Sequence, residues 1–123
     1  MIIQIYEVTT PAEARALGTM GVDHIGVLVG EGSFPREQTI EKARHIFAAI
    51  PAGSKACALS LSHDADLIMR FTAALLPDIL HLGAAPHHLS PAQLRTLKTK
   101  FPQVALMRSI PVVDESSVAL ARS

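Results

Sequence analysis

The segment IIQIYEVTTPAEARALGTMGVDHIGVLV, residues 2–29, decides the fold class, because two short apolar runs enclose a helix with clear boundaries. Thr9 or Thr10 is a candidate N-cap, Pro11 follows in the first turn, and Gly21 marks the end of the helix. A strand, a helix and a second strand in this order are typical of a right-handed βαβ unit with parallel strands.

The same arrangement recurs along the rest of the chain. Each of five β-rich runs is followed by a segment with helical character, and the runs are IIQIY (2–6), HIGVLV (24–29), KACALSL (55–61), DILHLG (78–83) and VALMRSI (104–110). Ser62, Ser90 and Asp114 are candidate N-caps of the last three helices. The runs are mostly apolar on both faces, as a sheet covered by helices requires. The pattern predicts an α/β fold with a parallel sheet, and a doubly wound sheet and a (β/α)8 barrel both satisfy it.

The charge and hydropathy of the sequence argue against two classes of binding partner, nucleic acid and membranes. Eleven basic and eleven acidic residues give no net charge, which argues against nucleic acid or an anionic membrane as the main partner. No run approaches the roughly 18 apolar residues of a membrane span, and the start lacks the features of a signal peptide. We therefore expect one domain over residues 1–123, soluble and cytoplasmic. The one cysteine, Cys57, lies in an apolar run and is predicted to be a buried, inert thiol.

The glycines do not favour a dinucleotide-binding fold. The first strand-to-helix turn, YEVTTP, contains no glycine and so cannot bring backbone amides close to a pyrophosphate. GEGS (30–33), after the second strand, is a weaker candidate for a phosphate loop, and we interpret it as an ordinary loop.

Six segments together resemble one known family. They are IQIYEVTTPAEA (3–14), GVDHIGVLV (21–29), FPREQTIEKAR (34–44), IPAGSKACALSLS (50–62), PDILHLGA (77–84) and LMRSIPVVDESSVALA (106–121). In order and spacing they resemble the amino-terminal half of phosphoribosylanthranilate isomerase, a ribulose-phosphate-binding barrel of tryptophan biosynthesis. The resemblance implies a TIM (β/α)8-barrel type of fold with five of the eight βα units, a partial or truncated barrel, since a full barrel takes about 250 residues.

The resemblance also implies a reaction, the Amadori-type isomerisation of a phosphoribosylated aromatic amine, which needs a general acid and a general base. The family's base is a cysteine at the tip of the first strand, and Tyr6 stands at that position. A phenol, with a pKa of about 10 against about 8.5 for a thiol, is a poorer base. Glu7 replaces the family's next residue, a glycine, and could serve as the acid or base. A hydrogen-bonded core tyrosine and a solvated carboxylate are the structural alternatives for these two residues.

Three residues are predicted to bind the substrate. Arg36 matches an arginine expected to hold the anthranilate carboxylate, with an exposed loop arginine as the alternative. His81 takes the place of the family's glutamine in the fourth strand, and a buried polar role is its alternative. Arg108 replaces the lysine of the fifth strand. The family's histidine at the end of the fourth strand is matched by Gly83, and the sixth-strand aspartate that serves as the general acid has no counterpart.

No cofactor and no metal are predicted, because the six histidines match no known zinc spacing. His87 and His88 are expected to be surface-loop residues. Three functions stay open: an isomerase-like protein, active or divergent; a different sugar-phosphate isomerase or lyase, with or without metal assistance; and a non-catalytic half-barrel that associates with itself as a homo-oligomer.

Overall fold

A computed structural model describes residues 1–83 and 89–122, in which five strands alternate with five helices. The elements are β1 (Gln4–Ile5), α1 (Pro11–Thr19), β2 (His24–Leu28), α2 (Ile40–Ala48), β3 (Lys55–Ser60), α3 (Ala65–Leu75), β4 (Ile79–Leu82), α4 (Pro91–Lys100), β5 (Ala105–Arg108) and α5 (Ser116–Arg122). Each strand lies inside or at the edge of the run predicted for it. His87 and His88 fall outside the described residues.

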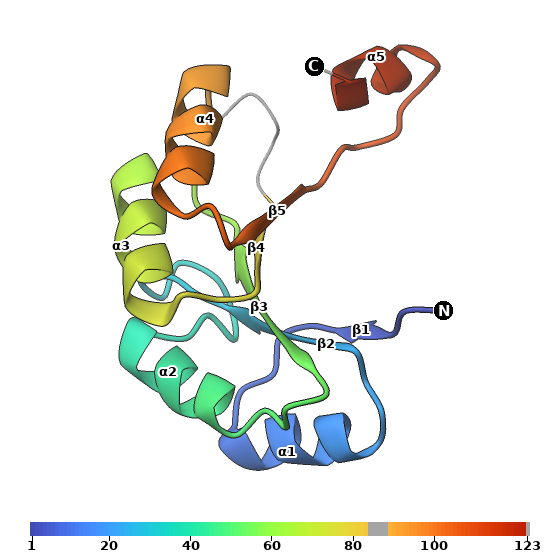
Figure 1. Cartoon of the computed structure of the whole chain (residues 1–123). Coiled ribbons are helices and arrows are strands. Elements are labelled where there is room, and N and C mark those ends of the chain that lie inside the picture. The colour runs from blue at the N-terminus through green and yellow to red at the C-terminus, as the bar shows by residue number, and fades with distance from the viewer. Residues whose placement is uncertain (84–88, 123) are drawn as a thin grey trace.

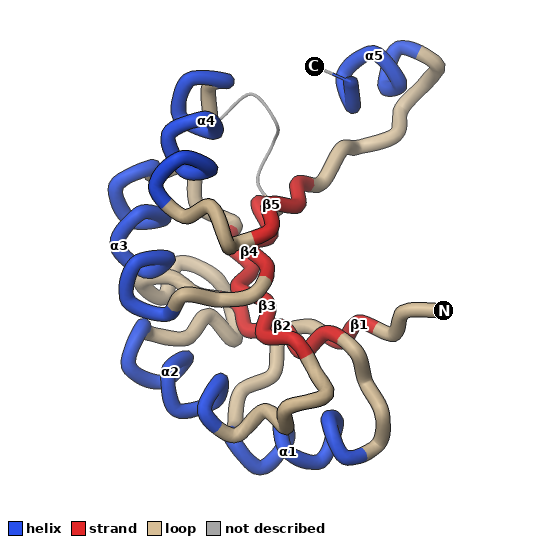
Figure 2. The backbone as a smooth tube through the Cα atoms, in the orientation of Figure 1, coloured by secondary structure: helices blue, strands red, loops and turns tan. Residues whose placement is uncertain are grey.

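The five strands form one sheet in the order β1-β2-β3-β4-β5, and every neighbouring pair is parallel. Helices α1 to α4 lie along the same side of this sheet (Figures 1 and 2). A doubly wound sheet would place helices on both faces and reverse its strand order at a switch point. Consecutive order with helices on one face is the arrangement of a barrel wall, so the prediction of five βα units of a barrel-type fold is confirmed.

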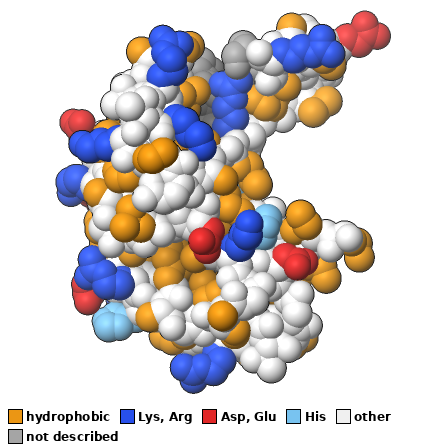
Figure 3. All heavy atoms as spheres, viewed as in Figure 1, with side chains coloured by type: hydrophobic (Ala, Val, Ile, Leu, Met, Phe, Trp, Pro, Cys, Tyr) orange, Lys and Arg blue, Asp and Glu red, His pale blue; other side chains and the backbone are white. Residues whose placement is uncertain are grey.

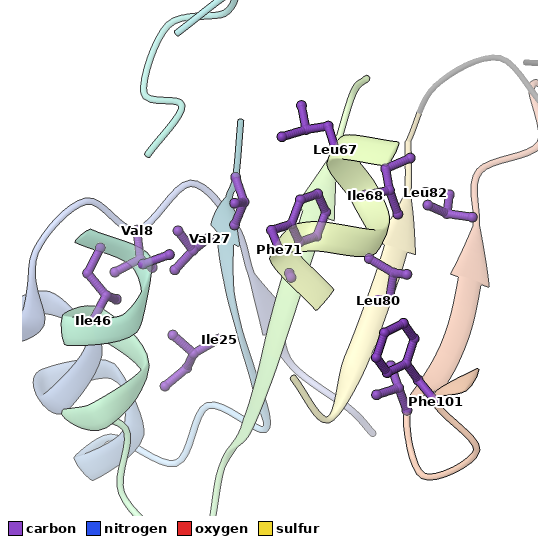
Figure 4. Close-up of a cluster of buried hydrophobic side chains, with 14 of the residues drawn as sticks. Val8, Ile25, Val27, Ile46, Leu67, Ile68, Phe71, Leu80, Leu82 and Phe101 are labelled. Atoms are coloured by element: carbon purple, nitrogen blue, oxygen red, sulfur yellow. The ribbon is translucent and has the colours of Figure 1, made fainter. Parts of the chain in front are cut away.

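The main core lies between the sheet and helices α1 to α4, and Figure 4 shows the part of it around α2 and α3. Alternate strand residues point to the helices, and this set includes Ile25, Val27, Ala58, Leu80 and Leu82. On the helix side, Phe71 of α3 is completely buried among them. Because strand side chains alternate between faces, the residues between these apolar positions lie on the face away from the helices, which we call the concave face.

Local capping sets where the helices begin. Thr10 Oγ1 accepts a hydrogen bond from the Glu13 amide at the start of α1, and Ser90 forms a capping box with Gln93 at the start of α4. The prediction for α3 was wrong by two residues. Asp64, not Ser62, is the N-cap, because its carboxylate accepts from two amides of the first turn, while the Ser62 hydroxyl accepts from the Asp64 amide.

Helix α5 follows an extended segment and lies apart from the layer formed by α1 to α4 (Figure 1). Asp114 Oδ1 accepts from the Ser116 amide at 2.8 Å, which is the contact expected of the predicted cap. Among the described residues, the helices are all too short or too polar to cross a bilayer.

The ends of α1 and α3 differ in backbone conformation. Met20 closes α1 at φ −77°, whereas Leu76 closes α3 in the left-handed region at φ 44°. Both side chains are largely exposed, so little packing would change if either were removed. A left-handed conformation costs a residue with a Cβ atom roughly 1–2 kcal/mol, a cost that glycine does not carry.

We therefore expect Leu76→Gly to raise the free energy of unfolding by about 0.5–1 kcal/mol, since the strain relieved exceeds the added chain entropy. The matched control is Met20→Gly, where no strain exists and about 0.5–1 kcal/mol should be lost. Urea unfolding of both variants measures the difference. A loss of stability in Leu76→Gly equal to that in Met20→Gly would contradict the assignment.

Candidate functional site

Tyr6 lies just beyond β1 on the concave face, where the neighbouring strand leaves room for its ring. A Cβ atom added to Gly26 of β2 would lie only 2.2 Å from Tyr6 Cδ1. The ring therefore occupies the space of the side chain that β2 lacks. Gln4 and Tyr6 share a face of the first strand, as the alternation predicted.

Polar groups from three strands, β1, β3 and β4, meet at the Tyr6 hydroxyl. Gln4 Nε2 and His81 Nδ1 each lie 2.5 Å from the phenol oxygen, and the buried Cys57 Sγ lies 3.6 Å away. The Tyr6 and His81 rings are tilted by 55° with centroids 5.4 Å apart. The other ring nitrogen, His81 Nε2, lies 2.9 Å from the Ser109 hydroxyl. The structure thus joins β1, β3, β4 and the end of β5 through one set of contacts.

Burial shifts the protonation of this cluster toward its neutral forms. It raises the pKa of Tyr6 well above the usual phenol value; the neighbouring Cys57 adds to the rise and the hydrogen bond from Gln4 opposes it. Burial likewise raises the pKa of the Cys57 thiol, as expected for an inert cysteine, and lowers the pKa of His81. At neutral pH the phenol is protonated and the imidazole is uncharged, so Tyr6 can donate a hydrogen bond but is a weak acid, poorly suited to give up its proton.

Glu7 and Arg36 form a second pair, on the loops that follow β1 and β2. Glu7 Oε2 lies 3.4 Å from an Arg36 Nη atom, and both side chains are partly open to solvent. Both residues also have left-handed backbones, with φ of 60° for Glu7 and 64° for Arg36. Such conformations cost of order 1–3 kcal/mol each and are found more often at functional sites. The structure thus places the predicted catalytic carboxylate against the predicted substrate-binding guanidinium.

The GEGS loop already holds an anionic group from its own chain. Glu37 Oε1 accepts hydrogen bonds from the amides of Gly32 at 2.6 Å and Ser33 at 2.9 Å. The same carboxylate lies where a side chain on Gly30 would be, because an added Cβ would come within 2.1 Å of Glu37 Cδ. The amides that made this segment a weak phosphate-loop candidate are therefore occupied by Glu37.

Arg108 and Ser109 lie on opposite faces at the end of β5. Arg108 is paired in register with Leu82, a core residue, and lines a cavity of about 260 Å³ beside α4 and α5. It is not brought together with Tyr6 and His81, and its substrate-binding role stays a prediction. Sequence analysis missed Ser109, which alternation places on the face of His81 and its partner Met107.

Among residues 1–83 and 89–122, no three histidine, cysteine or acidic side chains are grouped closely enough to hold a metal ion. The site that the structure brings together therefore consists of the Tyr6 cluster, formed by Gln4, Tyr6, Cys57, His81 and Ser109, and the pair of Glu7 and Arg36. Both lie toward the carboxyl ends of the strands, where barrel enzymes carry their active sites.

The chain matches no profile of a known protein family and no curated protein sequence. Its fold does match solved structures. Over 98% of the chain it is similar, with a TM-score of 0.82 and 16% identity, to a phosphoribosyl anthranilate isomerase in complex with reduced 1-(o-carboxyphenylamino)-1-deoxyribulose 5-phosphate. The isomerase from Thermotoga maritima gives 0.81 and 16% over 98% of the chain, and the enzyme from Pyrococcus furiosus gives 0.73 and 19% over 99%.

These comparisons establish the fold that the sequence resemblance implied. The chain spans 59%, 56% and 60% of the lengths of the three structures, in the same order. At identities below 20% the likeness concerns the arrangement of strands and helices, whereas the chemistry has to be argued from the side chains.

The lowered pKa of His81 predicts how stability depends on pH. The folded state binds the proton on His81 more weakly than the unfolded chain does. The contribution of neutral His81 to stability is therefore complete above the unfolded pKa of about 6.5 and is lost as pH falls from there through the lower pKa of the folded state. The free energy of unfolding of the wild type should therefore decrease between pH 7.5 and pH 5.5. The decrease should be smaller for the His81→Gln variant. His45→Gln, at an exposed position of α2, is the control. Equal pH dependence in wild type and His81→Gln would refute the prediction.

Proposed function

We propose that this chain binds a phosphoribosylated aromatic amine and carries groups for its Amadori-type isomerisation, as part of a phosphoribosylanthranilate isomerase-like protein of tryptophan biosynthesis. The observation that carries the proposal is the pairing of Glu7 with Arg36 beside the Tyr6 cluster, on a fold similar to isomerase structures. One of those structures holds a reduced carboxyphenylamino-deoxyribulose phosphate, which suggests the ligand class for this chain.

The rearrangement of the open-chain imine requires a proton to leave the second carbon and a proton to reach the first carbon, while the 2-hydroxyl loses its proton and the imine nitrogen gains one. Glu7 is the proposed base, because its carboxylate stands at the strand tip beside Arg36. Once protonated, Glu7 is also the proposed acid, whereas the Tyr6 phenol, which burial keeps protonated, is hydrogen-bonded to His81 within the cluster. The catalytic role is thus proposed for Glu7, which stands where the family has a glycine, and a supporting role for Tyr6, which stands where the family has a cysteine.

Arg36 has two potential partners under this proposal. Its guanidinium is the group expected to bind the carboxylate of the aromatic ring, but Glu7 already lies 3.4 Å from it. A substrate carboxylate would therefore share Arg36 with Glu7 or displace it. Binding and catalysis should respond in opposite directions when the Glu7 charge is removed.

We expect Glu7→Gln to bind the reduced carboxyphenylamino-deoxyribulose phosphate about 3- to 10-fold more tightly, because one competing charge-assisted contact is weakened. The same variant should lose about 10²-fold or more in turnover of phosphoribosylanthranilate, as expected for removal of a general base. Calorimetry and a turnover assay on the same preparations measure the two effects.

Arg36→Met should weaken binding of the same compound by about 10- to 100-fold through loss of a charge-assisted contact. Arg44→Met is the matched control, since Arg44 lies on the exposed face of α2 and pairs with Glu41. Equal affinity in the Arg36 and Arg44 variants would remove Arg36 from the site. Unchanged turnover in Glu7→Gln would remove Glu7 as the base.

Self-association is a second candidate function, favoured by one surface feature. Large apolar side chains are exposed around β1, namely Met1, Ile2, Ile3 and Ile5. Figure 3 shows hydrophobic atoms gathered at this end of the chain, beside a hollow between it and the segment leading to α5. In the part of the chain that the structure describes, β1 and β5 each pair with a strand on one side only. Unpaired edges of this kind are templates for pairing with another chain.

A second copy is the partner we expect at this edge. Light scattering of the 123-residue chain should then give at least twice the mass of one chain, and Ile3→Lys should shift it toward the monomer, because an edge lysine opposes strand pairing. Met20→Lys, an exposed apolar residue at the end of α1, should leave the mass unchanged. A monomeric wild type excludes this candidate.

A further inference from the structure

One member of the Tyr6 cluster, the Ser109 hydroxyl, has no role in the proposed function. The contacts run from Gln4 to Tyr6, from Tyr6 to His81 and from His81 to Ser109. Each of these side chains has a fixed set of hydrogen-bond donors and acceptors. Once the donor in one contact is known, the donors in the following contacts are determined as well.

The contacts of the phenol oxygen determine which atom donates in the hydrogen bond between Tyr6 and His81. It accepts from Gln4 Nε2, an amide nitrogen that can only donate, and from the Cys57 thiol. These two donors fill both lone pairs of the Tyr6 oxygen, so its own hydrogen is directed to the remaining neighbour, His81 Nδ1, at 2.5 Å. The reverse direction would require the Gln4 amide to be turned, with its oxygen facing the phenol.

The imidazole transmits this direction to Ser109. A neutral histidine carries one N–H and one lone pair, so a ring that accepts at Nδ1 carries its hydrogen on Nε2. Nε2 then donates to Ser109 Oγ at 2.9 Å, and the hydrogen of the serine hydroxyl is available for a hydrogen bond to another acceptor. Among the described residues, His81 is the one side chain that the structure gives as a partner of this hydroxyl.

We propose that Ser109 contacts the ligand as a hydrogen-bond donor to a carbonyl or hydroxyl oxygen, with Tyr6 and His81 as the positioning residues that fix its direction. The ligand assumed is the sugar phosphate of the proposed function, on which this part of the inference rests. Successive hydrogen bonds that point the same way polarise one another, so the terminal hydroxyl is a stronger donor than an isolated serine.

The position of Ser109 fits this role. Its amide continues the ladder to Leu82 O just past β5, at the carboxyl end of the sheet. It shares the concave face with His81, whereas the adjacent Arg108 lies on the helix side. A ligand on the concave face would therefore meet Ser109 before it met the buried part of the cluster.

The direction of the series is tested without any ligand, by nitrogen NMR of the His81 ring in the 123-residue chain at neutral pH. We expect the hydrogen on Nε2 in wild type. Gln4→Glu should move it to Nδ1, because a carboxylate only accepts and would draw the phenol hydrogen to itself. Gln4→Met, the control of similar size, should keep it on Nε2. A wild-type ring with its hydrogen on Nδ1 overturns the proposal, and so does a folded Gln4→Glu variant that keeps it on Nε2.

The contact with the ligand is tested by calorimetry with the reduced carboxyphenylamino-deoxyribulose phosphate. Ser109→Ala should weaken binding about 3- to 10-fold, the usual effect of one neutral hydrogen bond. Ser54→Ala is the control, because Ser54 Oγ donates to Val22 O in the turn before β3, at the opposite end of the sheet. Equal affinity in wild type and Ser109→Ala overturns the contact but leaves the proposed function intact. A wild-type chain that does not bind overturns both the proposed function and the contact, while the NMR result still decides the direction.

Discussion

The structure depends on a single geometric constraint, which is that neighbouring side chains of a strand point to opposite faces of the sheet. With α1 to α4 covering one face, each strand commits one set of residues to the apolar core and the alternate set to the concave face. Parallel order then brings the ends of all five strands to the same edge. Residues as distant in sequence as Gln4 and Ser109 belong to one cluster for this reason.

Within that cluster, low polarity governs the chemistry. Burial favours the uncharged forms of Tyr6, Cys57 and His81, while hydrogen bonds satisfy their polar atoms. The charged groups lie elsewhere, on loops, where Glu7 and Arg36 neutralise each other and are partly solvated. The site is thus divided into a neutral hydrogen-bonded interior, formed by the Tyr6 cluster, and an ionic rim, formed by Glu7 and Arg36.

The sequence predicted the fold well because strand and helix periods, caps and order are local properties. It placed β1 to β5 and the cap Ser90 correctly and offered Thr9 or Thr10 for α1, of which Thr10 is the cap. At α3 it selected Ser62, whereas the nearby Asp64 is the cap. The site was less predictable. The contact between Glu37 and the GEGS amides, and the convergence of Ser109 on His81, arise from backbone paths that no local pattern encodes. Strand alternation does predict that Ser109 and Arg108 lie on opposite faces of the sheet, but not that Ser109 contacts His81.

The close approach of Gly26 to the Tyr6 ring has a consequence for how such a chain could have diverged. Since any Cβ at residue 26 would collide with the aromatic ring, a large residue at the tip of β1 is admissible only while its neighbour on β2 has no side chain. The two positions are epistatic. Any side chain introduced at residue 26 would have to be accompanied by a smaller residue at position 6 or by a displacement of the ring.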